Sequence, residues 1–176
     1  YSSGREAAFR TAIYGTFEGR SMAPDVLVGQ EFLSAAAVTN FLAILNSAPG
    51  SPGDWSAAPF IDGPDSDNAF FYRRSKVTYL NATIAAAGST GANDQPRHTV
   101  RYDVRPKGYS GAAVTLAIYS THMKAAGTTS DQQRRQVEAS RIVANVATLP
   151  AGWIPMLLGD FNMQSSNQQA WGTLTN

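Results

Sequence analysis

Three segments of the chain place apolar residues at helical spacing, and each predicts an amphipathic helix. Near the N-terminus, Ser3 and Glu6 have the spacing of a capping box, which would begin the first helix. The apolar face of this helix comprises Phe9, Ala12, Ile13 and Phe17. Ser34 is the expected N-cap of the second helix. Its apolar face comprises Val38, Phe41, Leu42 and Leu45.

The third predicted helix begins at Ser130, with Gln133 in the capping-box position. Its core-facing residues are Ala139, Ile142, Val143 and Val146. Pro150 and Gly152 follow and end the helix. All three helices are therefore expected to cover a sheet with one apolar face each.

Short apolar or alternating runs predict the strands, at residues 26–28, 70–73, 76–80, 99–104, 113–120 and 155–158. The first and the last of these runs are apolar throughout, which is typical of buried strands. A tight turn at Arg74-Ser75 joins the second run to the third. Loops are expected at 46–54 and 88–96, which are rich in turn-forming residues.

Strands and helices are mixed along the chain without a strict alternation, which favours a sheet-rich α/β sandwich. We see no internal repeat, and one domain is expected to cover residues 1–176. With 43% hydrophobic and 15% charged residues, the composition is that of a globular protein. The net charge of +1 does not point to a partner that is bound mainly through bulk charge.

The absence of cysteine excludes disulfides, thiol nucleophiles and cysteine-ligated zinc. No apolar run is long enough to span a membrane. The low charge and the many Ala, Gly, Ser and Thr residues resemble the composition of secreted bacterial proteins, and we expect a protein of that kind.

Polar side chains follow three of the predicted strands at the point where each strand ends. Glu31 follows the first strand, His122 follows the strand at 113–120, and Asp160 and Asn162 follow the last. Polar groups at strand ends tend to converge on one rim of a sheet. Each also has an ordinary structural reading, as a helix cap, a structural histidine or a turn. Their combination and order carry the functional interpretation.

Four elements, in this order, resemble the endonuclease/exonuclease/phosphatase superfamily. They are the PDVLVGQE sequence of residues 24–31, FFYR of residues 70–73, YSTHMKA of residues 119–125 and GDFN of residues 159–162. Residues 134–142 resemble the helix between the last two elements. The resemblance covers nearly the whole chain and implies a four-layer α/β/β/α sandwich of the deoxyribonuclease-I-like type, of which this chain would be a part.

The resemblance implies hydrolysis of a phosphate ester by in-line attack of water, with Mg²⁺, or else Mn²⁺ or Ca²⁺, as the cofactor. Glu31 would be the metal ligand. His122 would donate a proton to the leaving oxygen or hold the phosphate, and Asp160 would orient the attacking water or the histidine network. Asn162 would hydrogen-bond the phosphate as charge builds up in the transition state. Zinc fits poorly, because His98 and His122 are the only histidines.

The same resemblance suggests Arg101 as a contact for the substrate phosphate. Arg73 and Arg74 could also face the substrate, although these two could equally be solvated charges at strand edges. With a histidine at position 122, the chain resembles one branch of the family in particular. This branch contains pancreatic-type deoxyribonuclease, sphingomyelinases and inositol-polyphosphate phosphatases. We therefore expect nuclease-like phosphodiester hydrolysis, with nucleic acid among the candidate partners and lipid head groups or sugar phosphates as runners-up. A non-catalytic binding or structural module on the same scaffold is the alternative from a different class.

Members of this family also have segments without a counterpart in the sequence. One is a first strand that ends in a metal-supporting asparagine, and the others are C-terminal strands with an Asp-His pair that activates water. We expect the 176-residue chain to lack these parts of the domain, and to have little or no hydrolase activity alone.

Overall fold

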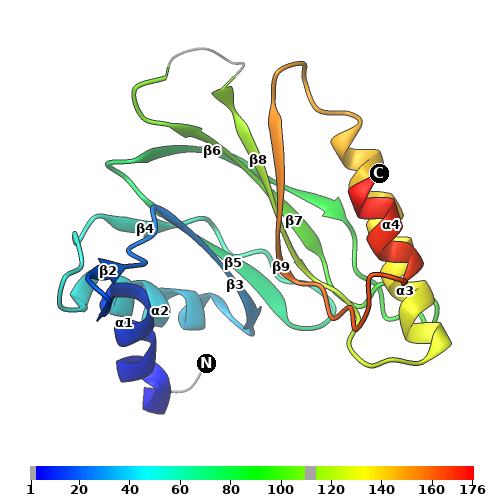
Figure 1. Ribbon diagram of the computed structural model, residues 1–176, viewed down its shortest axis with the longest axis horizontal. Helices are drawn as coiled ribbons and strands as arrows, with labels where there is room; N and C mark the ends of the chain where they lie inside the picture. Colours follow the sequence, from blue (N-terminus) through cyan, green and yellow to red (C-terminus); the bar gives the residue numbers. More distant parts are fainter. Residues whose placement is uncertain (1–2, 110–113) are drawn as a thin grey trace.

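Two β-sheets lie face to face in the computed structural model, which describes residues 3–109 and 114–176, and helices cover the outer face of each sheet (Figure 1). In chain order the elements are η1 (Ser3–Arg5), α1 (Glu6–Tyr14), β1 (Thr16–Phe17), β2 (Arg20–Ser21), β3 (Val26–Phe32), α2 (Ala35–Ser47), β4 (Trp55–Ala57), β5 (Asp67–Arg73), β6 (Val77–Ala86), β7 (Thr99–Pro106), β8 (Leu116–His122), α3 (Thr129–Val146), β9 (Ile154–Asp160) and α4 (Gln169–Thr175). The layers follow the order α/β/β/α, as the resemblance to the family implied.

The first sheet has the strand order β3-β5-β4, with β5 antiparallel to both neighbours. The helices α1 and α2 cover its outer face, because their apolar stripes pack on the outward-facing residues of β3 and β5. This cluster is built around Ile13, Phe32, Phe41, Leu45 and Phe71. Ser34 caps α2 as predicted, since its hydroxyl accepts a hydrogen bond from the amide of Ala37 at 3.2 Å.

The second sheet has the strand order β6-β7-β8-β9. The pairs β6/β7 and β7/β8 are antiparallel, whereas β8 and β9 run parallel with α3 as the crossover between them. The helices α3 and α4 cover the outer face through a cluster that includes Tyr119, Met123, Ala139 and Ile142. The parallel pair brings the C-terminal ends of β8 and β9 to the same edge of the sheet.

An apolar layer joins the two sheets. Phe70 of β5 stacks on Tyr102 of β7, with ring centroids 4.5 Å apart, and Val100, Val104 and Ile118 complete the buried cluster. The predicted turn at Arg74-Ser75 connects β5 of the first sheet to β6 of the second sheet. The two strands therefore do not pair as a hairpin. A short turn alone does not determine whether the strands on either side pair or diverge.

The N-caps of α1 and α3 differ from the prediction. The residue that precedes α1 is Arg5, not Ser3, and the side chain of Arg5 makes no capping hydrogen bond. In α3 the capping box is made by Thr128 and Asp131 instead of Ser130 and Gln133. Thr128 takes this position because its hydroxyl accepts a hydrogen bond from the backbone amide of Asp131. The carboxylate of Asp131 in turn accepts one from the backbone amide of Thr128.

Two apolar faces also differ from the prediction. Phe17 lies in β1 rather than α1 and is 78% exposed, and Val143 of α3 is 41% exposed. The predicted start of a strand at Ala113 lies outside the described residues, and β8 begins at Leu116. No helix among the described residues is long and apolar enough to cross a membrane.

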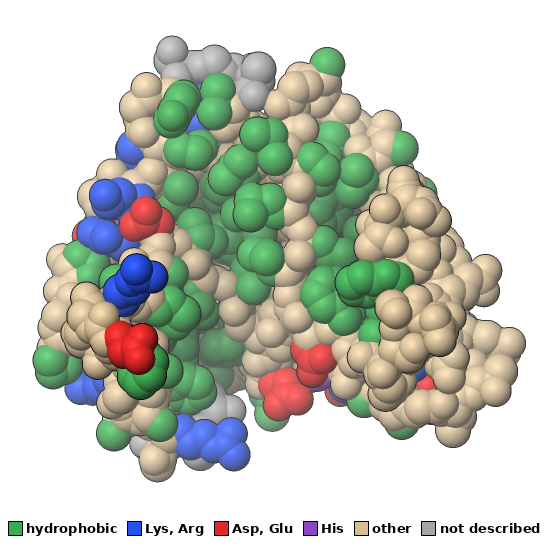
Figure 2. All heavy atoms as spheres, viewed as in Figure 1, with side chains coloured by type: hydrophobic (Ala, Val, Ile, Leu, Met, Phe, Trp, Pro, Cys, Tyr) green, Lys and Arg blue, Asp and Glu red, His purple; other side chains and the backbone are tan. Residues whose placement is uncertain are grey.

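The prediction that residues 155–158 form a buried strand is wrong. β9 is the edge strand of its sheet, and Ile154, Met156 and Leu158 are between 36% and 48% exposed. These three residues lie on the face opposite Leu157, which packs against the α3 side. β3 is also an edge strand and is only half-buried over residues 26–28. Figure 2 shows hydrophobic side chains gathered in the hollow between the two halves, with acidic side chains at its lower end.

Candidate active site

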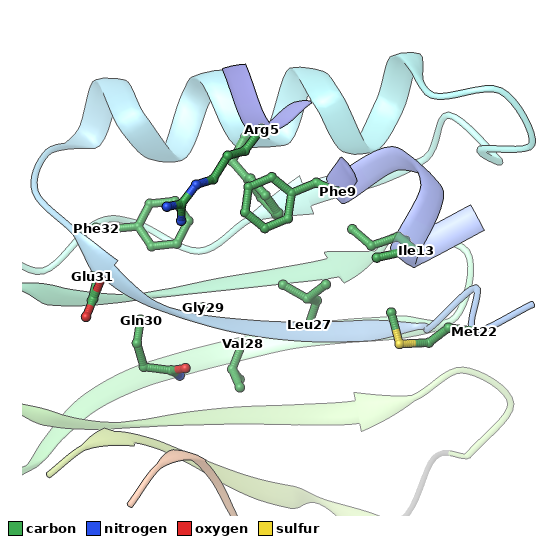
Figure 3. Close-up of a pocket in the computed structure, with 12 residues that line it drawn as sticks. Arg5, Phe9, Ile13, Met22, Leu27, Val28, Gly29, Gln30, Glu31 and Phe32 are labelled. Carbon is green, nitrogen blue, oxygen red and sulfur yellow. The ribbon is translucent and has the colours of Figure 1, made fainter. Parts of the chain in front are cut away.

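A β-bulge presents Glu31 near the end of β3. The pairing of β3 with β5 is regular up to Gly29 opposite Ala69 and resumes at Phe32 opposite Asp67. Gln30 and Glu31 thus oppose the single residue Asn68. Glu31 has a φ of +65°, a left-handed conformation that costs energy for a residue with a side chain. Such bulges re-aim side chains, and here Gln30 and Glu31 both point to the side of the second sheet (Figure 3).

His122 and Asp160 are paired residues at the ends of the parallel strands β8 and β9. The Nε2 atom of His122 lies 3.8 Å from Oδ2 of Asp160, which is longer than a hydrogen bond. The side chain of Asp160 is 55% exposed, whereas that of His122 is 6% exposed. Both groups can therefore still bind a water or a substrate oxygen.

Gly159 permits the close approach of the two strands. Its φ is +135°, and a Cβ atom at this position would lie 2.0 Å from the carbonyl oxygen of Thr121. Only glycine fits both restrictions. The glycine of the GDFN sequence thus sets the position of Asp160 relative to His122.

The loop after β9 folds back on the end of β8. The amide of Asn162 donates to Oδ1 of Asp160 at 2.9 Å, and the side-chain amide of Asn162 donates to the carbonyl of Met123 at 3.0 Å. Asn162 has a φ of +50°, a conformation that asparagine tolerates better than most residues. These bonds fix Asn162 beside Asp160 and close to the residue that follows His122.

The electrostatic surroundings of His122 link the two sheets. Burial lowers its pKa, and the positive charge of Arg97 lowers it further. The carboxylates of Asp160, Glu31 and Asp65 raise the pKa, but by less. His122 is therefore neutral at neutral pH. Its Nδ1 atom is buried without a hydrogen-bond partner, which places the proton on Nε2, because an unpaired buried N–H would cost more.

Sequence reasoning missed Arg97. Its guanidinium is held by Asp65 at 3.0 Å and by the hydroxyl of Ser66 at 3.0 Å, and the side chain is 15% exposed. The antiparallel pairing of β7 with β8 could have indicated its place, since residues just before Thr99 must lie beside the end of β8.

The structure does not bring Arg73 and Arg101 to this group of residues. Arg73 is at the far end of β5, where it forms ion pairs with Asp54 at 2.9 Å and Asp25 at 3.3 Å. Arg101 lies under α3, with both Asp103 and Asn145 as hydrogen-bond acceptors. Each guanidinium already has partners, and these positions give no support to the expected phosphate contacts.

A groove of about 570 Å³ runs along the open edge of β3 (Figure 3). Its walls are mainly apolar and come from α1, α2 and β3, with Phe9, Ile13, Leu27 and Phe41 among them. Glu31 stands at one end of the groove, while His122 and Asp160 do not line it. The groove is therefore a neighbour of the candidate site and not its cleft.

The donor groups of the site fit magnesium better than zinc. Among the described residues, no three His, Cys, Asp or Glu side chains are grouped closely enough to hold a metal ion by themselves. Mg²⁺ needs only one or two protein carboxylates, because it keeps several waters and binds substrate phosphate. Glu31 and Asp160 supply oxygen donors of this type, and the chain has no cysteine.

No protein-family model matches the sequence, and no curated protein is similar to it. Solved structures of several proteins resemble the fold. TDP2 from D. rerio, in complex with a single-strand DNA product, has a TM-score of 0.62 and 19% identity over 86% of this chain and 53% of that one. The human Nocturnin catalytic domain, with a bound sulfate anion, has a TM-score of 0.59 and 18% identity over 86% and 56%.

The third structure is an endonuclease/exonuclease/phosphatase family protein from Bacteroides thetaiotaomicron. It has a TM-score of 0.60 and 16% identity over 98% of this chain and 58% of that one. The chain thus spans somewhat more than half the length of the solved chains that it resembles. Its α/β/β/α layers and the order of its strands give this chain the deoxyribonuclease-I-like fold, the fold of the endonuclease/exonuclease/phosphatase structures that it matches.

Proposed function

We propose that this chain belongs to a metal-dependent phosphoesterase that hydrolyses phosphodiesters by in-line attack of water, as a nuclease does. The observation that carries the proposal is the convergence of Glu31, from one sheet, with His122 and Asp160, from the other. The charge of Glu31 acts on the imidazole of His122, and Asp160 lies 3.8 Å from it. A scaffold alone requires no such group of polar side chains at one rim.

Each residue has a role that follows from its surroundings. Glu31 holds Mg²⁺, which when bound offsets the charge of the phosphoryl oxygens. His122 carries its proton on Nε2, facing Asp160, and donates a hydrogen bond through it to a phosphate oxygen. Asp160 accepts a hydrogen bond from the attacking water through Oδ2, while its Oδ1 is occupied by the amide of Asn162. The side-chain amide of Asn162 has a second N–H, which hydrogen-bonds the phosphate.

Arg97 takes the place of Arg73 and Arg101 as the candidate positive charge. Because Asp65 and Ser66 hold its guanidinium, the charge is fixed close to His122 and favours an anionic substrate at the rim without reorganisation. The TDP2 structure contains a single-strand DNA product and the Nocturnin structure a sulfate anion. Both ligands favour a phosphodiester or a related oxyanion as the substrate class here.

The test is hydrolysis of single-stranded DNA and of bis(p-nitrophenyl) phosphate, with Mg²⁺ and with EDTA, by the protein at its natural length. We expect EDTA to abolish turnover and Glu31→Gln to lower it by about 10²-fold or more, with a weaker response to Mg²⁺. Glu18→Gln is the matched control, because Glu18 is an exposed glutamate outside the site. Unchanged turnover in EDTA, or equal effects of both variants, would contradict the proposal.

A further inference from the structure

A chain of hydrogen bonds crosses from one sheet to the other directly below the candidate site. The side-chain amide of Gln30 donates to the hydroxyl of Ser120 at 3.2 Å. That hydroxyl donates to Oδ1 of Asn68 at 2.9 Å, and the amide of Asn68 donates to the carbonyl of His98 at 2.8 Å. This relay thus joins β3, β8 and β5 to the residue that precedes β7.

The members of the relay stand next to the site residues in the chain. Gln30 precedes Glu31 and belongs to the same bulge, and Asn68 is the β5 residue that opposes this bulge. Ser120 is two residues before His122 on β8. In Figure 3, Gln30 reaches from the bulge toward the second sheet, on the same side as Glu31.

The polar character of the relay is costly unless every member is paired. Ser120 is fully buried and Asn68 is 3% exposed, and the contacts between the sheets beyond them are apolar. The hydroxyl of Ser120 uses its donor and its acceptor capacity at once, so its removal takes this partner from both Asn68 and Gln30. Apolar residues would fill this space without the risk of leaving a buried polar group unpaired. A polar link at this level is therefore suited to setting one spacing and one register between the sheets.

We infer that Ser120, with Gln30 and Asn68, is the positioning group that fixes the distance between the metal-binding carboxylate of Glu31 and the imidazole of His122. This inference rests on the proposed function, because it concerns a metal ion at Glu31. The two groups come from different sheets, and the strained bulge at Glu31 can relax if its partners are lost. A misplacement of about 1 Å in such a site can cost roughly 10²-fold in rate.

The experiment measures how strongly Mn²⁺ relaxes the ring protons of His122 in the NMR spectrum, since this effect falls steeply with the distance from the ion. The chain has two histidines, which keeps the ring signals few. In the unchanged protein we expect strong relaxation of the His122 signals, and Glu31→Gln should abolish it. Ser120→Ala should weaken the relaxation at saturating Mn²⁺, because the ion and the ring move apart.

Gln30→Ala interrupts the relay at its half-buried end and should produce the same loss, even if Ser120→Ala fails to fold. Tyr119→Phe is the matched control. It removes the neighbouring hydroxyl on the opposite face of β8, where Tyr119 donates to Asn145 at 2.8 Å, and it should leave the relaxation unchanged.

Each outcome decides one point. Relaxation of His122 that survives both relay variants overturns the inference and leaves the proposed function standing. An equal loss in Tyr119→Phe also overturns it, because the relay would then have no special part. If Mn²⁺ does not relax His122 in the unchanged protein, the proposed metal site fails and the inference fails with it.

Discussion

Asp67 is a buried carboxyl group whose ionisation conflicts with its place in the fold. It is 4% exposed, and its Oδ1 atom is buried without a hydrogen-bond partner. Burial, together with the charges of Asp62 and Asp65, raises its pKa to about 6. The folded protein therefore binds a proton at Asp67 in a pH range where the unfolded chain, with a pKa of 3.8, does not.

Asp67→Asn should stabilise the protein at pH 7.5 but not at pH 3.5. Because the folded-state pKa is raised, stability falls as the pH rises from about 4 through about 6, and this change in pKa corresponds to about 3 kcal/mol at most. We expect the substitution to recover about 1–3 kcal/mol in urea unfolding above pH 7. A difference between the two proteins that does not depend on pH would contradict this account.

Single residues also mark where sequence reasoning ended. Glu31, His122, Asp160 and Asn162 were predicted as site residues because each follows a predicted apolar strand in a recognisable order. Arg97 was missed because its location depends on a partner loop, in which Asp65 and Ser66 hold the guanidinium. Arg73 carried a plausible charge, but its nearest carboxylates belong to Asp25 and Asp54, far from it in sequence.

The strands that carry the site are shaped by local irregularities. The bulge in β3 turns Glu31 toward the second sheet, and Gly159 lets the tip of β9 approach β8. Helix α3 stabilises the loops on both sides of this tip. Its buried Arg135 donates hydrogen bonds to the carbonyls of Lys124 and Ala126 and to the side chains of Gln164 and Gln168.

Gly159→Ala should lower stability by about 2–5 kcal/mol, because the added methyl group meets the Thr121 carbonyl and the backbone conformation disfavours a side chain. Gly172→Ala is the control. It lies within α4, its Cβ would be 3.9 Å from the nearest side-chain atom, and alanine should be neutral or gain about 0.5–1 kcal/mol. Urea unfolding of both variants gives the comparison, and similar stabilities would contradict the close approach.

Periodicity predicted most of the helices and strands, but not the irregular features of the elements. The bulge at Gln30 and Glu31 depends on the partner strand β5, which no local pattern reveals. Helix starts were misplaced where several Ser and Thr residues compete for the cap, as at Thr128 and Ser130. The apolar run of residues 155–158 is typical of a buried strand, yet β9 lies at a sheet edge.

The whole molecule is a sandwich in which one edge strand of each sheet, β3 and β9, lies on the same side. β3 and β9 each have a single strand neighbour, and exposed apolar residues line the hollow between them (Figure 2). The layer order was implied by the resemblance to the family, whereas the apolar patterns alone predicted only a sheet-rich α/β sandwich. Those patterns could not predict the relative placement of the two sheets, since it depends on contacts such as Phe70 against Tyr102 and Gln30 against Ser120.

The central claim is that Glu31 and His122, from opposite sheets, serve one metal and one phosphate. A crystal structure of the protein with Mn²⁺ and a phosphorothioate oligonucleotide tests it most directly, because anomalous scattering locates the ion. The account predicts a single ion bound to Glu31 and a phosphate group that bridges this ion to Nε2 of His122 and the amide of Asn162. An ion or a phosphate bound elsewhere, with Glu31 and His122 left in contact with solvent only, would contradict it.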